Sequence, residues 1–354
     1  MKVKKLIVFM LVGVLLTFNV VGCGQQTPST TPQVSSDSGK TLTIMSNGGY
    51  YLETLKKYVI GPFEKKYGAK VLVTEATSTQ MLNRLRAEKA SPTVDLVSIG
   101  EIGAVPGRTE GLFDKMDVSK IPNMADVSPS LKNKEGFGIQ SVMSPIVMVY
   151  NKDKVKTPPT AWADLWNPEY KGHVVIADMD NTMGPMLLVT AAKLNGGDEN
   201  NIDPGFKKMS ELKPNLSYIY KGEGQEVPQG VTQGNIWVTA MMLVKAQDLI
   251  KQGAHVGIVI PKEGAHPLPY TLEIVKGTKN ADLAYKFIDM ALSQEAQLGF
   301  AKDLLVTPSN TKVQIPADLK DILPTSDRLM AMDWSAIAKN RSAWTDRWNK
   351  EITK

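Results

Sequence analysis

Short β-type runs alternate with amphipathic helical stretches from residue 41 onwards, and this alternation restricts the fold more than any other feature of the chain. Apolar residues recur at helical spacing over residues 50–67 and 77–89. Around them stand three β-type runs, at residues 41–45, 70–74 and 94–98. Residues 41–98 therefore predict a βαβαβ unit with a buried parallel sheet.

A second alternation follows a less regular stretch and begins with the β-type run at residues 144–150. Its elements are expected at residues 173–177, 182–195, 216–220, 236–252 and 256–260, in the order strand, helix, strand, helix, strand. A further strand at residues 271–275 and helices at 281–292 and 294–304 come after it. The chain thus predicts two α/β units in series, which agrees with its length of 354 residues.

The N-terminal segment has the layout of a bacterial secretion signal. Residues 1–5 carry three lysines, residues 6–21 are mainly apolar, and the run ends in Val20-Val21-Gly22-Cys23, which resembles a lipobox. We expect residues 1–22 to be a signal peptide and Cys23 to be acylated, which would anchor the protein on the outer face of the cytoplasmic membrane. The alternative is an ordinary signal peptide with an incidental thiol.

Residues 24–40 contain one apolar side chain among Pro, Ser, Thr and Gln, so they predict a flexible tether. Cys23 is the single cysteine, which excludes a disulfide framework and a cysteine zinc site. Three of the 41 basic residues lie in the signal segment, leaving 38 basic against 36 acidic residues in the rest of the chain. This near balance gives no support to a nucleic-acid partner.

The motifs of known catalytic and cofactor sites are missing. The histidines His173, His255 and His266 do not have metal-ligand spacing, and no P-loop, dinucleotide-binding or nucleophile-elbow motif occurs, so no cofactor or metal is expected. Asp178 and Asp180 leave one enzymatic alternative, a lipid-anchored extracellular hydrolase. Two α/β lobes without catalytic parts favour a binding protein whose ligand lies at the carboxyl ends of the strands.

The C-terminal segment carries a stripe of large apolar residues at helical spacing. The stripe consists of Trp334, Ile337, Trp344, Trp348 and Ile352. Packing against the body is the favoured interpretation, and a ligand platform is the alternative.

Several stretches resemble the type II periplasmic-binding-protein group of ABC transporter substrate-binding proteins, in particular its spermidine/putrescine branch. They are GGYYLETLKKYVIGPFEKKYG (48–68), VYNKDKV (149–155), PTAWADLWNPEYKGHV (159–174), LNGGDENNIDPGF (194–206) and PKEG (261–264). The resemblance implies an α/β fold of two lobes joined by crossover hinge strands, with lobe one at 41–148 plus 265–354 and lobe two at 149–264. It also implies a monomer that delivers a small-molecule solute to an ABC permease.

The resemblance also implies where the solute is held. The matching positions are Ser46, Asn47, Tyr50, Ser98, Glu101, Asp180, Asn181, Thr182 and Tyr270. An alternative for Asp180, Asn181 or Thr182 is that it only caps the helix that follows. Of the neighbours Tyr50 and Tyr51 we expect Tyr50 in the cleft and Tyr51 in the core.

The solute is the least determined part of the prediction. Polyamine binders resembling this chain use a tryptophan and an aspartate where it has Leu268 and Tyr270, and a second aromatic position matches Met242. An ammonium without a carboxylate partner would be desolvated at a cost of several kcal/mol. We therefore expect a smaller polar solute, with an organic anion favoured. Polyamines, ferric iron bound through Tyr218 and Tyr220, and a solute-sensing role are the alternatives.

Overall fold

The computed structural model describes residues 40–354 except 134 and 223. The predicted signal peptide, Cys23 and residues 24–39 of the tether lie outside the described residues. The strands are β1 (Thr41–Ser46), β2 (Lys70–Glu75), β3 (Leu96–Gly100), β4 (Ile139–Asn151), β5 (Val174–Ala177), β6 (Leu216–Tyr220), β7 (Val238–Met242), β8 (Val256–Val259), β9 (His266–Ile274) and β10 (Thr307–Pro308).

Helices follow most of these strands. They are α1 (Gly49–Leu55), α2 (Gly61–Tyr67), α3 (Ser78–Ala87), α4 (Glu101–Thr109), α5 (Met183–Lys193), α6 (Asp203–Leu212), α7 (Val227–Thr232), α8 (Leu243–Lys251), α9 (Ala281–Ala291), α10 (Gln294–Leu304), α11 (Ala317–Lys320) and α12 (Trp334–Glu351). A π-helical turn, η1 (Lys56–Ile60), joins α1 to α2. Short 3-10 helices lie at Val118–Lys120, Pro122–Asp126, Pro129–Leu131, Trp162–Trp166, Pro168–Tyr170, Lys213–Asn215 and Ser326–Arg328.

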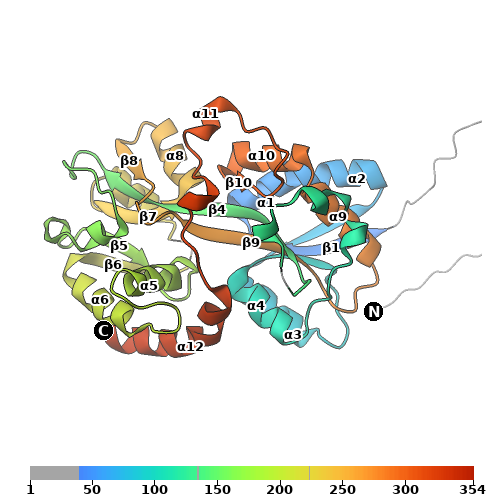
Figure 1. Cartoon of the computed structure of the whole chain (residues 1–354), viewed down its shortest axis with the longest axis horizontal. Helices are drawn as coiled ribbons and strands as arrows, with labels where there is room; N and C mark the ends of the chain where they lie inside the picture. Colours follow the sequence, from blue (N-terminus) through green and yellow to red (C-terminus); the bar gives the residue numbers. More distant parts are fainter. Residues whose placement is uncertain (1–39, 134, 223) are drawn as a thin grey trace, which may run out of the picture. The chain divides into compact units, whose positions relative to one another are not determined.

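One mixed sheet runs through the described part of the chain in the order β2-β1-β3-β9-β4-β7-β5-β6, with β8 and β10 also paired to β4. β1 is parallel to β2 and β3, and β5 is parallel to β6 and β7. β9 and β4 are antiparallel to their neighbours and run side by side between these two parallel groups, as Figure 1 shows. The α/β class and the predicted βαβαβ unit are confirmed.

The second alternation is partly different from the prediction. The stretch 236–252, expected as one helix, contains the strand β7 and then α8. Because the stretch is apolar on both sides of Met242, hydrophobic periodicity does not mark where strand ends and helix begins. The less regular stretch before β4 contains α4, which has Gly103, Pro106 and Gly107 inside it and so gives a weak helix signal.

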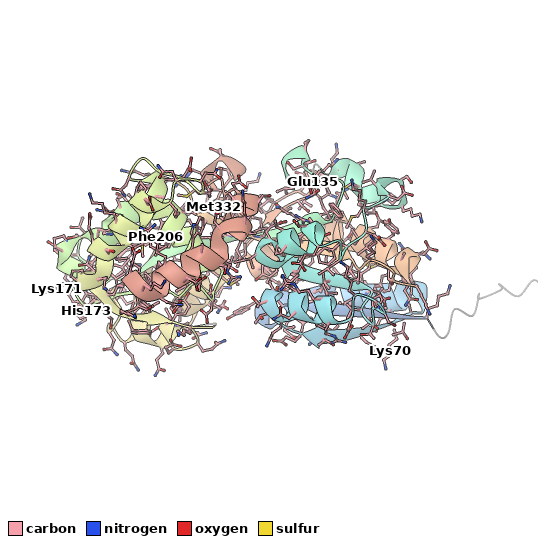
Figure 2. The ribbon with its side chains drawn as sticks, turned by 90° about the horizontal axis from the view of Figure 1, so that it is seen from below. Lys70, Glu135, Lys171, His173, Phe206 and Met332 are labelled. Carbon is pink, nitrogen blue, oxygen red and sulfur yellow. The ribbon has the colours of Figure 1, made fainter. Side chains whose placement is uncertain are left out.

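The stripe at the C-terminus packs in the core, as favoured from the sequence. Ile337, Trp344 and Trp348 of α12 are buried in one cluster with Trp162 and Phe206. Figure 2 shows α12 from below, lying over the elements that carry Phe206. Although residues 265–354 were assigned to lobe one, the apolar side of α12 thus packs with residues of lobe two.

Replacing Trp348 tests whether α12 is part of this core. Trp348 is fully buried, so Trp348→Ala should lower the free energy of unfolding by about 3–5 kcal/mol. Trp334→Ala, at a half-buried position of the same helix, is the matched control and should lower it by less. Urea unfolding followed by circular dichroism measures both. Equal losses in the two variants would contradict the packing described here.

Candidate functional site

A cavity of about 2150 Å³ lies between the part of the sheet that carries β1–β3 and the part that carries β5–β7. Its walls come from the loops after β1, β2, β5 and β6, from the end of β7, from β9 and from α12. In both parts of the sheet these loops follow the carboxyl ends of parallel strands. Ligands of open α/β sheets bind at this edge, so the cavity is the candidate binding site.

The turn between β1 and α1 forms one wall of the cavity and depends on two glycines. A Cβ on Gly48 would lie 1.5 Å from Oε1 of Glu75, and Gly49 has a φ of +63°. The side-chain amide of Asn47 donates to the carbonyl of Ala76, 3.2 Å away. This bond ties the loop after β1 to the loop after β2, so both loops keep a fixed position at the cavity.

A stacked pair of tyrosines supports the middle of the cavity. Tyr270 of β9 lines the cavity and stacks on Tyr51, with ring centroids 4.3 Å apart and an interplanar angle of 7°. Tyr51 is buried, and its hydroxyl accepts a hydrogen bond of 2.6 Å from Ser98 Oγ. Burial raises the pKa of Tyr51. Ser98 therefore reaches the cavity only through the two rings that it helps to position.

Tyr50 is exposed in the cavity and lies near a carboxylate of α8. It lines the cavity with 43% of its surface exposed, and the carboxylate of Asp248 in α8 lies near its hydroxyl. Partial burial and the Asp248 carboxylate raise the pKa of Tyr50 to about 12. The phenol is therefore neutral at physiological pH.

The loop between β5 and α5 forms the opposite wall. Asp180 Oδ2 accepts a hydrogen bond of 3.0 Å from the N–H of Gly222, and Asn181 Nδ2 donates to the carbonyl of the same residue at 2.7 Å. Gly222 follows β6, so these bonds hold together the loops after two neighbouring parallel strands. The side chains of Asp180 and Asn181, which were predicted from the sequence as site residues, thus fix this wall.

The N-terminus of α5 offers few free donors. Asn181 Oδ1 accepts from the N–H of Met183 at 2.9 Å, the N–H of Gly184 donates to the carbonyl of Asn181, and Pro185 has no N–H. Thr182 makes no capping bond with its side chain. Capping by Asn181, which the sequence left as an alternative to solute contact, is therefore present in the structure.

The structure separates the predicted site residues into two groups. Those that line the cavity are Asn47, Tyr50, Asp180, Asn181, Thr182 and Tyr270. Ser46, Ser98 and Glu101 are buried and do not line it. The hydroxyl of Ser46 donates to the carbonyl of Asn47 at 3.0 Å, whereas Ser98 and Glu101 bind other side chains. The expected direct solute contact is not supported for these three, because their side chains turn into the protein.

The sequence analysis considered a few further positions as possible solute contacts, and some of these line the cavity while others do not. Leu268, Met242 and Tyr220 line the cavity, and Tyr218 does not. Apart from these positions, Trp237 is half-buried against the core and stacks on His173, with centroids 4.1 Å apart. Within the described residues, no group of three or more His, Cys, Asp and Glu side chains is arranged to hold a metal ion.

α12 contributes a wall that sequence reasoning missed. Arg341 of α12 lines the cavity, together with several polar residues of the same helix. The sequence contains a signal for it. Arg341 lies four residues after Ile337 and three before Trp344, so a charged residue stands on the buried face of the helix. A cation at such a place needs a partner or a function.

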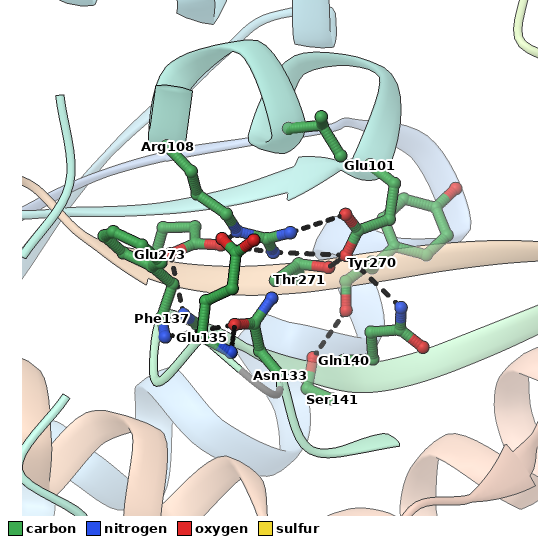
Figure 3. A network of polar contacts seen from close by, with 12 residues as sticks. Glu101, Arg108, Asn133, Glu135, Phe137, Gln140, Ser141, Tyr270, Thr271 and Glu273 are labelled. Carbon is green, nitrogen blue, oxygen red and sulfur yellow. Dashed lines mark hydrogen bonds and ion pairs between the residues drawn. The ribbon is translucent and has the colours of Figure 1, made fainter. Parts of the chain in front are cut away.

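A buried network of charges lies beside the cavity (Figure 3). Arg108 of α4 donates from Nη1 to Glu101 at 2.8 Å and from Nε to Glu273 of β9 at 2.7 Å. Thr271 Oγ1 donates to Glu101 at 2.7 Å, and the N–H of Gly138 donates to Glu273 at 2.8 Å. The network fastens α4 to β9 and explains why Glu101 is unavailable to a solute.

Comparison with known proteins identifies the family. The family model described as "Bacterial extracellular solute-binding protein" matches residues 59–325. The chain belongs to this family. Its members are solute-binding transport proteins, which decides between a binding protein and a hydrolase in favour of binding. Within the described part of the chain, no helix has both the length and the apolar character needed to cross a membrane.

Relatives and solved structures agree with this assignment. A "Gamma-aminobutyric acid-binding protein" of Pseudomonas aeruginosa is 25% identical over 296 residues, covering 81% of this chain and 82% of the relative. "Spermidine/putrescine-binding periplasmic protein 1" of Haemophilus influenzae is 25% identical over 333 residues, covering 88% and 90%. A crystal structure of an ABC transporter from Clostridium perfringens has a TM-score of 0.75 and 28% identity, covering 88% and 99%. The two-lobed type II fold is thereby confirmed.

The buried network predicts a particular pH dependence of stability. Burial raises the pKa of Glu273 to about 7, against the opposing effect of Arg108, whereas an unfolded glutamate titrates near about 4.3. Because the folded chain binds this proton more tightly, the stabilisation is complete below about pH 4 and is lost as the pH rises to about 7. Up to about 4 kcal/mol of unfolding free energy is involved.

The substitution Glu273→Gln should remove this loss of stability with rising pH. Between pH 5 and pH 7, the unmodified chain should lose unfolding free energy relative to Glu273→Gln. Urea unfolding of both proteins at each pH measures this difference. Glu110→Gln is the control, since Glu110 is partly exposed and its hydrogen bond to Arg86 lowers its pKa. A difference for Glu273→Gln that stays constant with pH would contradict the assignment.

Proposed function

We propose that the chain captures a small polar organic solute in the cavity between two lobes and delivers it to the permease of an ABC importer. The observation that supports this most is the cavity itself, whose walls come from strand ends in both parts of the sheet. Membership of the solute-binding family supports the same function. Two crossover strands, β4 and β9, join the parts and would serve as the hinge.

The proposed lobes follow the sequence division with one change. Residues 41–148 and the segment from 265 up to α12 form lobe one, and residues 149–264 form lobe two. α12 is now counted with lobe two, because Ile337 and Trp348 pack with its residues. Contact between α12 and α4 would then be a contact between lobes.

The proposed solute contacts are the cavity-lining members of the predicted set. They are Asn47, Tyr50, Asp180, Asn181, Thr182 and Tyr270. Tyr270 is the central one, since it lies on a crossover strand and its ring is held in place by Tyr51. Ser98 and Arg108 would act indirectly, by positioning Tyr51 and α4.

The names of the relatives include γ-aminobutyrate, polyamines and iron. In this chain Leu268, Tyr270 and Met242 line the cavity at the places where the resemblance puts the aromatic and acidic side chains of polyamine binders. At these places an ammonium would lack the tryptophan and the aspartate that polyamine binders use. We therefore favour smaller polar solutes over polyamines as the solute of this cavity.

A screen of melting temperatures tests the proposal. The purified full chain is heated with one solute at a time, from a set of amino acids, dicarboxylates, sugar phosphates, polyamines and ferric citrate. One class of solute should raise the melting temperature, because binding to the folded state stabilises it by about 2.7 kcal/mol at a hundredfold excess over Kd. A set in which no solute raises the melting temperature would contradict the proposed function.

We also propose that Cys23 carries a lipid that keeps the protein on the outer face of the membrane, as the sequence Val20-Val21-Gly22-Cys23 suggests. In a bacterial host that processes lipoproteins, Cys23→Ser should move the protein from the membrane fraction to the soluble fraction, measured by immunoblot. Solute binding should not change, because the cavity lies in residues 47–349. A variant that stays in the membrane fraction would overturn this proposal.

A further inference from the structure

Arg341 differs from four of the other arginines of the chain in its surroundings. Arg84, Arg86, Arg108 and Arg347 each form an ion pair with a glutamate or aspartate. Arg341 lies in the wall of the cavity on the packed face of α12, and among the described residues no carboxylate comes within ion-pairing distance of it. It is therefore a partly buried cation at the candidate site without a paired anion.

The hydrogen bonds of Arg341 use only one of its nitrogens. Nη2 donates to the carbonyl of Met179 at 2.9 Å and to the carbonyl of Asp180 at 3.2 Å. Nε and Nη1 have no acceptor among the described residues, although a guanidinium carries five N–H donors. The side chain thus holds the loop after β5 and retains donors that are not used.

The charge of Arg341 is only partly compensated. Burial lowers the pKa of Arg341, and the negative charge of Asp180 acts in the opposite direction. The Asp180 carboxylate is itself bound to the N–H of Gly222 and forms no ion pair with Arg341 in the described part of the chain. Because a guanidinium stays protonated at physiological pH, the partly buried charge of Arg341 has lost hydration and has no paired anion to compensate for it.

Two further cations lie on this wall, which also carries the carboxylates of Asp178, Asp180 and Asp346. Lys221, after β6, and Lys245, in the first turn of α8, line the cavity and pair with no carboxylate among the described residues. By contrast, Lys56 and Lys57 of the opposite wall are paired with Glu53 and Asp303, at 2.8 Å and 2.7 Å. The unpaired cations therefore gather on the side of the cavity that β5–β7 and α12 form.

Resting on the proposed function, we propose that Arg341 binds an oxyanion of the solute, a carboxylate or a phosphate, through its unused N–H groups. A planar guanidinium can bind either group through two parallel hydrogen bonds, and such charge-assisted bonds are among the strongest in proteins. Solute binding would then complete the partners of Arg341 and draw the loop at Met179 and α12 together. The solute class follows: an anion or a zwitterion, not a polyamine.

Three four-carbon molecules provide a matched set of probes. Succinate has two carboxylates, γ-aminobutyrate has one carboxylate and one ammonium, and putrescine has two ammonium groups; glycerol 3-phosphate is added as the phosphate probe. Titration calorimetry with the full chain measures Kd for each, and for every solute that the melting screen detects. The solutes that bind should carry a carboxylate or a phosphate. The probe that binds shows which of these two groups Arg341 recognises.

Variants of α12 assign the binding to Arg341. Arg341→Gln removes the charge but keeps an amide donor for the loop carbonyls, and it should weaken binding of the anionic solute about 10- to 100-fold. Arg341→Lys keeps the charge but not the planar fork and should weaken it less. Arg347→Gln is the control on the same helix, where the half-exposed guanidinium pairs with Asp203 and Glu351 outside the cavity lining, and it should bind as the unmodified chain does.

The outcomes separate this inference from the proposed function. Binding of putrescine as tight as that of the anionic probes, or equal affinity in Arg341→Gln and Arg347→Gln, would overturn the role of Arg341 and leave solute capture intact. Equal weakening by Arg341→Gln and Arg341→Lys would assign Arg341 a structural role only and also overturn the inference. If Arg341→Gln does not fold, the affinities of Arg341→Lys and Arg347→Lys for the anionic solute are compared instead. Equal affinities would then overturn the role of Arg341. Absence of binding by any solute would instead contradict solute capture itself.

Discussion

The antiparallel pairing of β9 with β4 holds the molecule together. β4 is thirteen residues long; it pairs with β9 over Ile139–Ile146 and with β7 over Ile146–Tyr150. Because the two strands continue from one parallel group into the other, the carboxyl ends of β1 and β5 face the same cavity. β9 also carries Tyr270 into that cavity, so the element that joins the lobes forms part of the site.

Around this strand pair, hydrogen bonds between loops fix the walls of the cavity. Asn47 joins the loops after β1 and β2, and Asp180 and Asn181 join the loops after β5 and β6. Arg108 and two glutamates fasten α4 to β9. Side chains held in this way lose little further entropy when a solute binds, which favours a selective site.

The sequence predicted the parts of the fold that depend on local pattern. The βαβαβ unit and the stripe of α12 follow from hydrophobic periodicity, which the core preserves. The boundary between β7 and α8 was not predicted, because the run around Met242 is largely apolar. The site residues were harder to predict, although the loops were predicted correctly. The direction of the Ser98 side chain depends on Tyr51, 47 residues away in the chain, and that of Glu101 depends on Arg108, which Glu273 of β9 also holds. The pairing of Arg108 with Glu273 spans 165 residues and leaves no local signal.

A crystal structure of the full chain with a solute from the melting screen is the most direct test of solute capture between the lobes. The account predicts electron density for the solute in the cavity, in contact with Tyr270 and with residues of the loop after β5. Density at another surface, with this cavity filled only by water, would contradict it.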